Sequence, residues 1–177
     1  MLFAKGPMEL TAYPAGLKDT SYTVPEGIVS IADYAFTGCA LEEVIFPSTL
    51  TGLGKHAFED AQSLRSVTVP GSVSEVPSFC FAGCSNLETV TIEAGVTRIG
   101  PKAFGSGKLT EITLPDGVKE LSSNAFSECT ALTAIHVPAS VETIGNGAIP
   151  QSATVYGKVD SVAWEYALKT GCAFVEE

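Results

Sequence analysis

A cysteine and a histidine, Cys129 and His136, stand seven positions apart in the sequence. A thiol beside an imidazole is the arrangement of an activated nucleophile, and both groups also bind zinc. Adjacent carboxylates occur at Glu42–Glu43 and at Glu59–Asp60, and such groups serve as general acids and bases. The elements that carry these residues decide whether any of them can act in this way.

Cys129 belongs to a sequence repeat. Phenylalanine recurs every 22 or 23 residues and an isoleucine ends the series: Phe36, Phe58, Phe81, Phe104, Phe126 and Ile149. A small residue precedes each of these positions, and columns of leucine and β-branched residues keep the same period. The unit reads P-x-x-V-x-x-I-x-x-x-A-F-x-x-C-x-x-L-x-x-I-x-V. A fixed period of this length is typical of solenoids, and the cysteine is one of its columns.

Each part of the unit predicts a local structure. L-x-x-I-x-V alternates apolar and polar residues and is rich in β-branched side chains, which favours a short strand. The apolar pair of A-F-x-x-C between polar residues favours a tight helical turn. One unit cannot bury its own apolar face, but stacked units can. We therefore expect a solenoid of about six coils of 22–23 residues, with one parallel β-sheet and short 3₁₀ or turn segments opposite it.

The strand pattern L-x-x-L-x-L is typical of leucine-rich repeats. More narrowly, the motif I-x-x-x-A-F-x-x-C-x-x-L-x-x-I-x-V-P, seen in SIADYAFTGCALEEVIFP at 30–47, resembles the BspA-like leucine-rich repeats of bacterial surface proteins. The resemblance covers residues 22–157 in six coils. It implies a leucine-rich-repeat solenoid at a bacterial cell surface or in a secreted protein, with adhesion to other proteins as its role.

The two ends depart from the repeat and are predicted to cap it. Near the N-terminus, LFA and LTAY flank AKGPME and predict a hairpin over one open edge of the sheet. Near the C-terminus, Ser161 can cap a helix that runs to about Lys169, and Gly171 can stop it. CAFV then predicts a short strand. The predicted division is a capping hairpin at 1–21, the repeat array at 22–157 and a C-terminal cap of helix plus strand at 158–177.

The C-terminal helix has two dissimilar sides. Val162, Tyr166 and Lys169 lie on one side, and Trp164 and Leu168 lie on another. We expect this helix to cover the last coil.

One column differs from commoner leucine-rich repeats, which hold a buried asparagine eight residues after the strand leucine. This chain has small residues there: Thr49, Ser72, Gly95, Gly117 and Ser140. Either the small hydroxyls or neighbouring carbonyls must then satisfy the backbone amides.

The cysteine column has a packing explanation. Cys39, Cys84 and Cys129 alternate along it with Ala61 and Gly107, so the position accepts small buried residues. Cysteines two coils apart would be roughly 10 Å distant at the ~4.8 Å strand spacing, which exceeds the ~7 Å that a disulfide spans. We therefore expect reduced, slowly reacting thiols.

The remaining candidates for chemistry have the same kind of explanation. Cys80 and Cys84 form C-x-x-x-C rather than a zinc-type C-x-x-C, and Cys80 stands where alanine usually stands. Cys172, in the terminal cap, is expected to be the most reactive thiol. His56 occupies a variable position and is predicted to be exposed. His136 is predicted to point outward from a strand four coils further along, so the two histidines cannot share a site. We predict no catalytic residue, no metal or cofactor site and no enzyme.

Composition narrows the function further. The net charge is −10 without a basic cluster, which opposes binding to nucleic acid or to anionic membranes. No apolar run approaches the ~18 residues of a membrane span, so no membrane insertion is expected. The N-terminal residues MLFAKGPMEL lack the basic and apolar regions of a signal peptide, and we expect the chain to be a piece of a larger protein.

A solenoid offers a long rigid surface, so we predict a protein-binding or adhesion module; the alternative is a structural spacer within a larger surface protein. The candidate binding surface consists of the outward strand positions in two columns: Glu43, Ser66, Thr89, Glu111 and Ala134, and Ile45, Thr68, Thr91, Thr113 and His136. These columns lack tryptophan, tyrosine and arginine, so weak binding strengthened by multivalency is expected.

Overall fold

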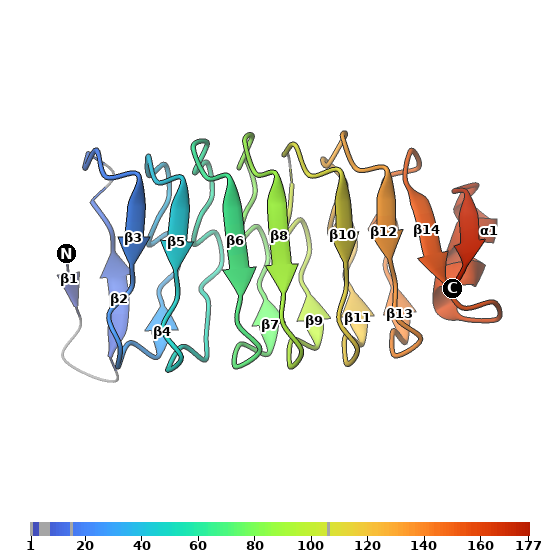
Figure 1. The fold of residues 1–177 in the computed structure, drawn as a ribbon, viewed down its shortest axis with the longest axis horizontal. Helices are drawn as coiled ribbons and strands as arrows, with labels where there is room; N and C mark the ends of the chain where they lie inside the picture. Colours follow the sequence, from blue (N-terminus) through green and yellow to red (C-terminus); the bar gives the residue numbers. More distant parts are fainter. Residues whose placement is uncertain (1, 4–7, 15, 106) are drawn as a thin grey trace.

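The computed structural model describes residues 2–3, 8–14, 16–105 and 107–177, and they form a solenoid with two parallel rows of strands (Figure 1). The first row follows the predicted strands: β3 (Ser21–Thr23), β5 (Glu43–Ile45), β6 (Ser66–Val69), β8 (Thr89–Ile92), β10 (Glu111–Thr113), β12 (Ala134–His136), β14 (Thr154–Gly157) and β15 (Phe174–Glu176). Neighbours pair in parallel as β3-β5-β6-β8 and as β10-β12-β14-β15. Between β8 and β10 the hydrogen-bonded ladder is interrupted.

The second row was not predicted. Two-residue strands stand where turn segments alone were expected: β4 (Ser30–Ile31), β7 (Glu75–Val76), β9 (Arg98–Ile99), β11 (Glu120–Leu121) and β13 (Thr143–Ile144). β7, β9, β11 and β13 form one parallel sheet. The prediction of a single sheet was therefore too simple, because stacking at strand spacing lets any extended dipeptide pair with its copies in the adjacent coils.

The predicted tight turn follows the second row. In the first full coil, Thr37 N–H donates to Tyr34 O over 3.2 Å and Cys39 N–H donates to Phe36 O over 3.2 Å. Between coils, Phe36 N–H donates to Ala57 O over 2.7 Å. The turn segment, like the strands of this coil, is thus joined to the next coil by backbone hydrogen bonds.

The phenylalanine column is the centre of the core. The rings of Phe36, Phe58, Phe81, Phe104 and Phe126 are at most 1% exposed. Successive rings stack nearly parallel, with centroids 4.6–5.3 Å apart. The leucine and β-branched columns are buried around them. The predicted core is confirmed.

The N-terminal end contains the predicted antiparallel pair, β1 (Leu2–Phe3) with β2 (Glu9–Ala12). Residues 4–7, where the sequence predicts the turn of that hairpin, lie outside the described residues. LTAY has a second role, because Tyr13 occupies the phenylalanine position and stacks on Phe36 at 5.3 Å. Its hydroxyl donates to Asp19 over 3.1 Å, and burial together with that carboxylate raises the pKa of Tyr13 to about 12.

The C-terminal end is closed by α1 (Val162–Thr170), with Ser161 as its N-cap and left-handed Gly171 as its C-cap. The hydroxyl of Tyr166 accepts from Ile149 N–H over 3.2 Å and donates to Ile149 O over 3.1 Å. In the earlier coils the equivalent N–H bonds to the following coil, as Phe126 N–H does to Ala148 O, so the Tyr166 hydroxyl takes the place of a further coil for this N–H. The predicted helix lid is confirmed, whereas the exact division at 21/22 and 157/158 stays a prediction.

Small hydroxyls replace the asparagine ladder. Thr49 Oγ1 accepts from Gly27 N–H over 3.0 Å and donates to Ile28 O over 2.8 Å. Ser140 Oγ likewise bridges Gly117 N–H and Val118 O, each over 3.0 Å. Of the two alternatives left open by the sequence, the hydroxyls satisfy the backbone at these coils.

Candidate functional site

The candidate surface lies on the outer side of the first row. Strand register aligns its residues in straight columns, Glu43 with Ser66 and Thr89, and Thr68 with Thr91. The columns resume beyond the interruption, where Thr113 pairs with His136. The structure thus places all ten predicted residues on one surface, which we call the sheet face.

The threonine hydroxyls in the middle of the sheet face are free to bond with a partner. The side chains of Thr68, Thr91 and Thr113 are exposed, and among the described residues they make no side-chain hydrogen bond. At one margin of the row, just before the strands, Arg65 contacts Glu42 at 3.2 Å and Glu88 at 3.7 Å. The centre of the face can therefore offer donors and acceptors to a partner without breaking contacts within the chain.

The sheet face extends further than the sequence predicted. Tyr156 on β14 pairs with His136, and Val175 on β15 pairs with Tyr156, so both continue the outer column. The last coil runs only 20 residues from Ile135 to its partner Val155, so a 22- or 23-residue period does not find Tyr156. The alternation of apolar Val155 with its neighbours in TVYG is the signal that could have identified this strand and its outward Tyr156. The ten predicted residues contain no tyrosine, but Tyr156 extends their outer column at the C-terminal end.

His136 is less open than predicted. Its Nδ1 lies 2.9 Å from Glu177 Oε1, and its Nε2 lies 3.4 Å from Glu111 Oε1. Its ring stacks on Tyr156 with a centroid distance of 4.6 Å. His136 still points away from the core, but it is held between two carboxylates at the C-terminal end of the face.

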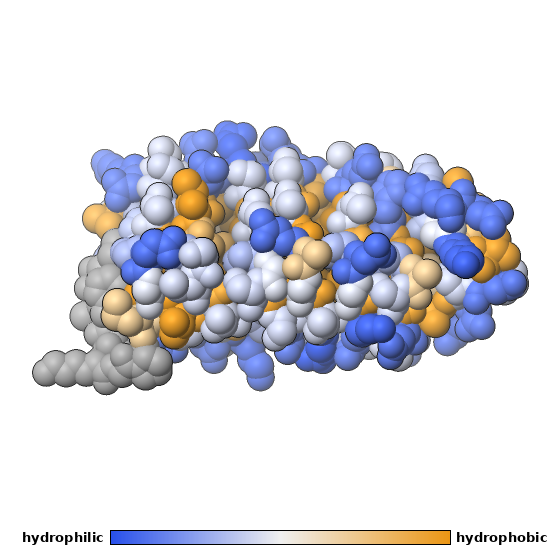
Figure 2. Space-filling model, turned by 60° about the horizontal axis from the view of Figure 1, so that its bottom comes forward, coloured by the Kyte–Doolittle hydropathy of each residue, from blue (hydrophilic) through white to orange (hydrophobic). Residues whose placement is uncertain are grey.

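Three shallow depressions lie along the sheet face. The first, of 220 Å³, is lined by Ile45, Phe46 and Thr68 among others. The second, of 410 Å³, spans the interruption between β8 and β10 and includes Thr91 and Thr113. The third, of 260 Å³, lies beside His136 and Lys158. Figure 2, with the lower side of Figure 1 turned forward, shows mostly hydrophilic or near-neutral side chains and separate hydrophobic spots.

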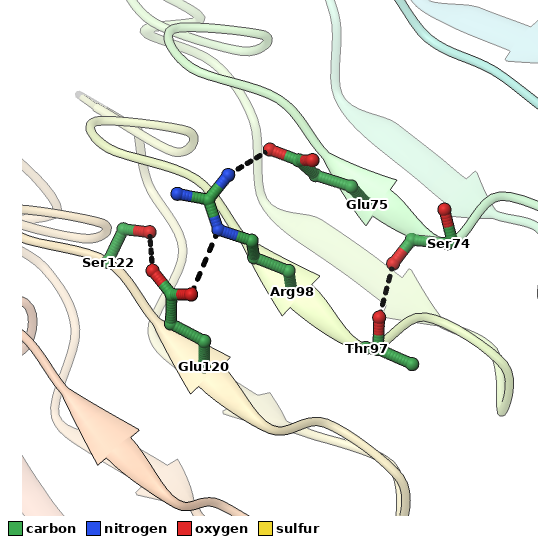
Figure 3. Close-up of polar contacts among 6 residues, drawn as sticks. All are labelled: Ser74, Glu75, Thr97, Arg98, Glu120 and Ser122. Atoms are coloured by element: carbon green, nitrogen blue, oxygen red, sulfur yellow. Dashed lines mark hydrogen bonds and ion pairs between the residues drawn. The ribbon is translucent and has the colours of Figure 1, made fainter.

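The second row carries ion pairs across its strands (Figure 3). Arg98 Nη1 lies 2.6 Å from Glu75 Oε1, and Arg98 Nε lies 3.1 Å from Glu120 Oε2. Ser122 Oγ donates to Glu120 Oε1 over 2.6 Å. This hydroxyl and Arg98 lower the pKa of Glu120. Burial acts to lower the pKa of Arg98, but the two carboxylates outweigh it and raise that pKa.

His56 is not exposed as predicted. Its ring is stacked between Tyr34 at 4.6 Å and Phe79 at 4.8 Å, so the side chain is only 22% exposed. Lys102 Nζ lies 5.8 Å from the centre of the Phe79 ring. These residues all have positive φ, between 51° and 61°, which places them in one column after the second row. Glu59 Oε1 is 3.2 Å from His56 Nδ1, without the geometry of a hydrogen bond.

The cysteines serve the core. All five thiols are free and buried. Cys129 Sγ donates to Phe104 O over 2.6 Å and Cys84 Sγ donates to Phe58 O over 3.2 Å. Burial raises the pKa of Cys129 to about 12 and raises that of Cys84 further. Such thiols stay protonated and are poor nucleophiles.

Cys129 and His136 therefore do not form a site, because the thiol lies in the core and the imidazole lies on the sheet face. Within the described residues, no group of His, Cys, Asp and Glu side chains could hold a metal ion. No helix in that part of the chain has the length and apolar character to cross a membrane.

Comparison with protein families decides the assignment. The model of the BspA-type leucine-rich repeat region matches in six copies, over residues 15–130 and 97–156. The chain belongs to the BspA-type leucine-rich repeat family. The predicted family and solenoid class are thereby confirmed. A search of curated proteins gave no match.

Solved structures share the solenoid fold. A leucine-rich repeat protein from Bacteroides ovatus is 25% identical with a TM-score of 0.73, covering 90% of this chain and 43% of that one. A leucine-rich cell surface protein from Faecalibacterium prausnitzii is 24% identical (TM-score 0.62), covering 92% and 38%. The T. pallidum leucine-rich repeat protein is 24% identical (TM-score 0.75), covering 98% and 94%. This BspA-type chain thus spans less than half of the first two proteins.

Proposed function

We propose that this chain is a non-enzymatic protein-binding module of a bacterial cell-surface or secreted protein, and that it acts in adhesion through the sheet face. Leucine-rich repeat families are generally interaction modules, which supports the general class. The observation that carries the proposal is that the two rows differ in how far their outward side chains bond within the chain. Thr68, Thr91 and Thr113 have exposed hydroxyls without partners in the described chain, whereas the second row uses its charges on itself.

The shape of the sheet face suits a protein partner. Five strands at ~4.8 Å spacing span roughly 20 Å, and the shared core holds them rigid. The depressions at Ile45 and beside His136 can receive single side chains, and Tyr156 between β12 and β15 is the residue type that dominates interface energies. Weak contacts of this kind gain strength when several modules act together.

The surface location rests on relatedness and charge. The Faecalibacterium prausnitzii relative is described as a cell surface protein. The net charge of −10 opposes partners such as nucleic acid and favours basic surfaces on proteins.

The competing function is a rigid spacer that holds other domains away from the envelope. The continuous phenylalanine ladder, capped by Tyr13 and Tyr166, favours it because it makes a stiff unit. A spacer needs no partner for its sheet face.

An array of secreted and cell-surface proteins, probed with the labelled 177-residue chain, separates the two functions. A binding module gives saturable binding to at least one protein, and unlabelled chain competes for it. A spacer gives none at any concentration tested. Heat-denatured chain is the control for contacts through exposed core residues.

A further inference from the structure

The first depression of the sheet face lies over the neighbouring strands β5 and β6 (Figure 1) and has a volume of 220 Å³. Its lining includes the apolar side chains of Ile45 and Phe46. Ile45 is 48% exposed, in an outer column that holds threonine at positions 68, 91 and 113. Phe46 is only partly buried, whereas Val69 of the same column is fully buried. The depression therefore exposes apolar surface where the next coil has a threonine and a buried valine.

Two carboxylates line the same depression. Glu43 is exposed on β5, and Glu93 follows β8 at a position that holds proline in the two preceding coils. Unlike a proline, Glu93 has an N–H, which donates to Val69 O over 3.0 Å. Glu93 Oε2 accepts from Gly71 N–H over 3.0 Å. These two bonds hold the backbone and the carboxylate of Glu93 beside the depression.

Neither carboxylate has a cationic partner among the described residues. Arg65, at the margin of the row, contacts Glu42 and Glu88 instead. No lysine or arginine in the described part of the chain forms an ion pair with Glu43 or Glu93. The first depression thus combines negative charge with apolar surface, and the described chain supplies no cation to it.

The other two depressions differ in this respect. Glu111, which lines the second, lies 3.4 Å from His136 Nε2. The third is lined by Lys158 as well as by His136. Charge complementarity with a basic partner is therefore strongest at the first depression.

We propose that the first depression receives an arginine side chain from a protein partner. This inference rests on the proposed function, because it names the chemistry by which the sheet face recognises that partner. The aliphatic part of arginine can cover Ile45 and Phe46, and its planar guanidinium can stack on an aromatic ring. The guanidinium donates charge-assisted hydrogen bonds to Glu43 and Glu93, and the Thr68 hydroxyl can accept a further one.

Arginine suits this depression better than lysine. The ammonium of lysine is a compact and strongly hydrated charge, whereas the guanidinium is more weakly hydrated and carries several N–H donors in one plane. One arginine can therefore bind carboxylates from two coils at once. The net charge of −10 also attracts basic partners over a longer range.

The test titrates the isotopically labelled full chain with three blocked heptapeptides, followed by NMR. The peptides consist of serine and valine and differ only in the central residue, which is arginine, lysine or citrulline, the neutral isostere of arginine. We expect the arginine peptide to shift the amide signals of Ile45 and Thr68 saturably. The citrulline peptide should bind at least about tenfold more weakly, and the lysine peptide should lie between them. Added salt should weaken binding of the arginine peptide.

Two double variants locate the charges that matter. Glu43→Gln with Glu93→Gln removes both carboxylates and keeps an oxygen that can accept from Gly71 N–H. It should bind the arginine peptide at least about tenfold more weakly and the citrulline peptide as before. The matched control, Glu128→Gln with Glu142→Gln, changes the net charge equally on other sides of the coil, where both residues form exposed ion pairs. It should bind the arginine peptide like the wild type, and circular dichroism shows whether each variant is folded.

Equal binding of the arginine and citrulline peptides overturns the inference, as does binding that both double variants weaken equally. The absence of any shift at Ile45 and Thr68 overturns it as well. These results leave the proposed function standing, because the protein array can still identify a partner of other chemistry. An array without any partner overturns the proposed function, whatever the peptides show.

Discussion

The two rows of strands are formed by the same repeat and pack on one core, yet their outward side chains differ in character. In the first row, half of the ten outward residues of the sheet face are serine or threonine, and the central threonine side chains are exposed without a hydrogen bond in the described chain. In the second row Arg98 is held between Glu75 and Glu120, and Lys119 pairs with Glu142 at 2.8 Å. Partly exposed ion pairs contribute little stability but favour one alignment of neighbouring coils. The second row therefore pairs its charged groups with one another, whereas Thr68, Thr91 and Thr113 of the first row make no side-chain hydrogen bond within the described residues.

The largest effect is expected from a substitution in the phenylalanine column, the core on which both rows pack. Phe104 is 1% exposed and stacks between Phe81 and Phe126 at 5.3 Å on each side. Phe104→Ala should cost about 3–5 kcal/mol of unfolding free energy, measured by chemical denaturation. Amide exchange should show both rows losing protection together. A loss below ~1 kcal/mol would mean that the phenylalanine column is not the common core.

The next effect concerns the end of that core. Tyr166→Phe leaves the N–H and C=O of Ile149 without the hydroxyl that bonds to both. Unsatisfied buried polar groups cost about 1–3 kcal/mol, so thermal unfolding should occur at a clearly lower temperature. Tyr156→Phe is the matched control, because the Tyr156 hydroxyl makes no hydrogen bond within the described chain. Equal effects of the two substitutions would contradict the capping role.

A smaller effect belongs to the second row alone. Because Ser122 and Arg98 lower the pKa of Glu120 from 4.5, the folded state favours the carboxylate. This stability is present above the unfolded pKa and is lost as the pH falls through the lower folded pKa. Glu120→Gln should therefore flatten the fall in unfolding free energy below about pH 4.5. Glu43→Gln, on the first row, should leave that slope unchanged; an equal change in both variants would contradict the difference between the rows.

Thiol reactivity tests the core between the rows with almost no perturbation. Cys39, Cys80, Cys84 and Cys129 are at most 2% exposed, and Cys172 is 8% exposed. Thiol titration of the native protein should show Cys172 reacting first and the other four reacting only after denaturant is added. Mass evidence for a native disulfide among Cys39, Cys84 and Cys129 would contradict the stacking.

The sequence predicted what the period determines and missed what breaks it. The phenylalanine ladder, the Ser161 and Gly171 helix ends and the outward columns follow from spacing and residue type alone. The second row was missed because two-residue strands such as β9 have no alternation of their own; they form only because adjacent coils lie at strand spacing.

The errors in the candidate site have equally local causes. Tyr156 was missed because the last coil is short. His56 was expected to be exposed because its column varies, but the left-handed backbone stacks its ring between those of Tyr34 and Phe79. Contacts that depend on the chain returning from far away, such as Glu177 with His136, leave no local signal.

The most direct test of the account places the same charge on each row. Thr68, Thr91 and Thr113 are changed together to Arg on the first row, and Ser74, Thr97 and Thr143 are changed together to Arg on the second. All six residues are exposed, and the second-row substitutions remove one hydrogen bond, from Thr97 Oγ1 to Ser74 O over 3.0 Å. Each triple variant should therefore keep its fold and nearly all of its stability. Affinity is then measured for a protein that the array identifies. The account predicts that the first-row variant loses binding and the second-row variant retains it. Retained binding by a folded first-row variant would contradict the assignment of function to the sheet face.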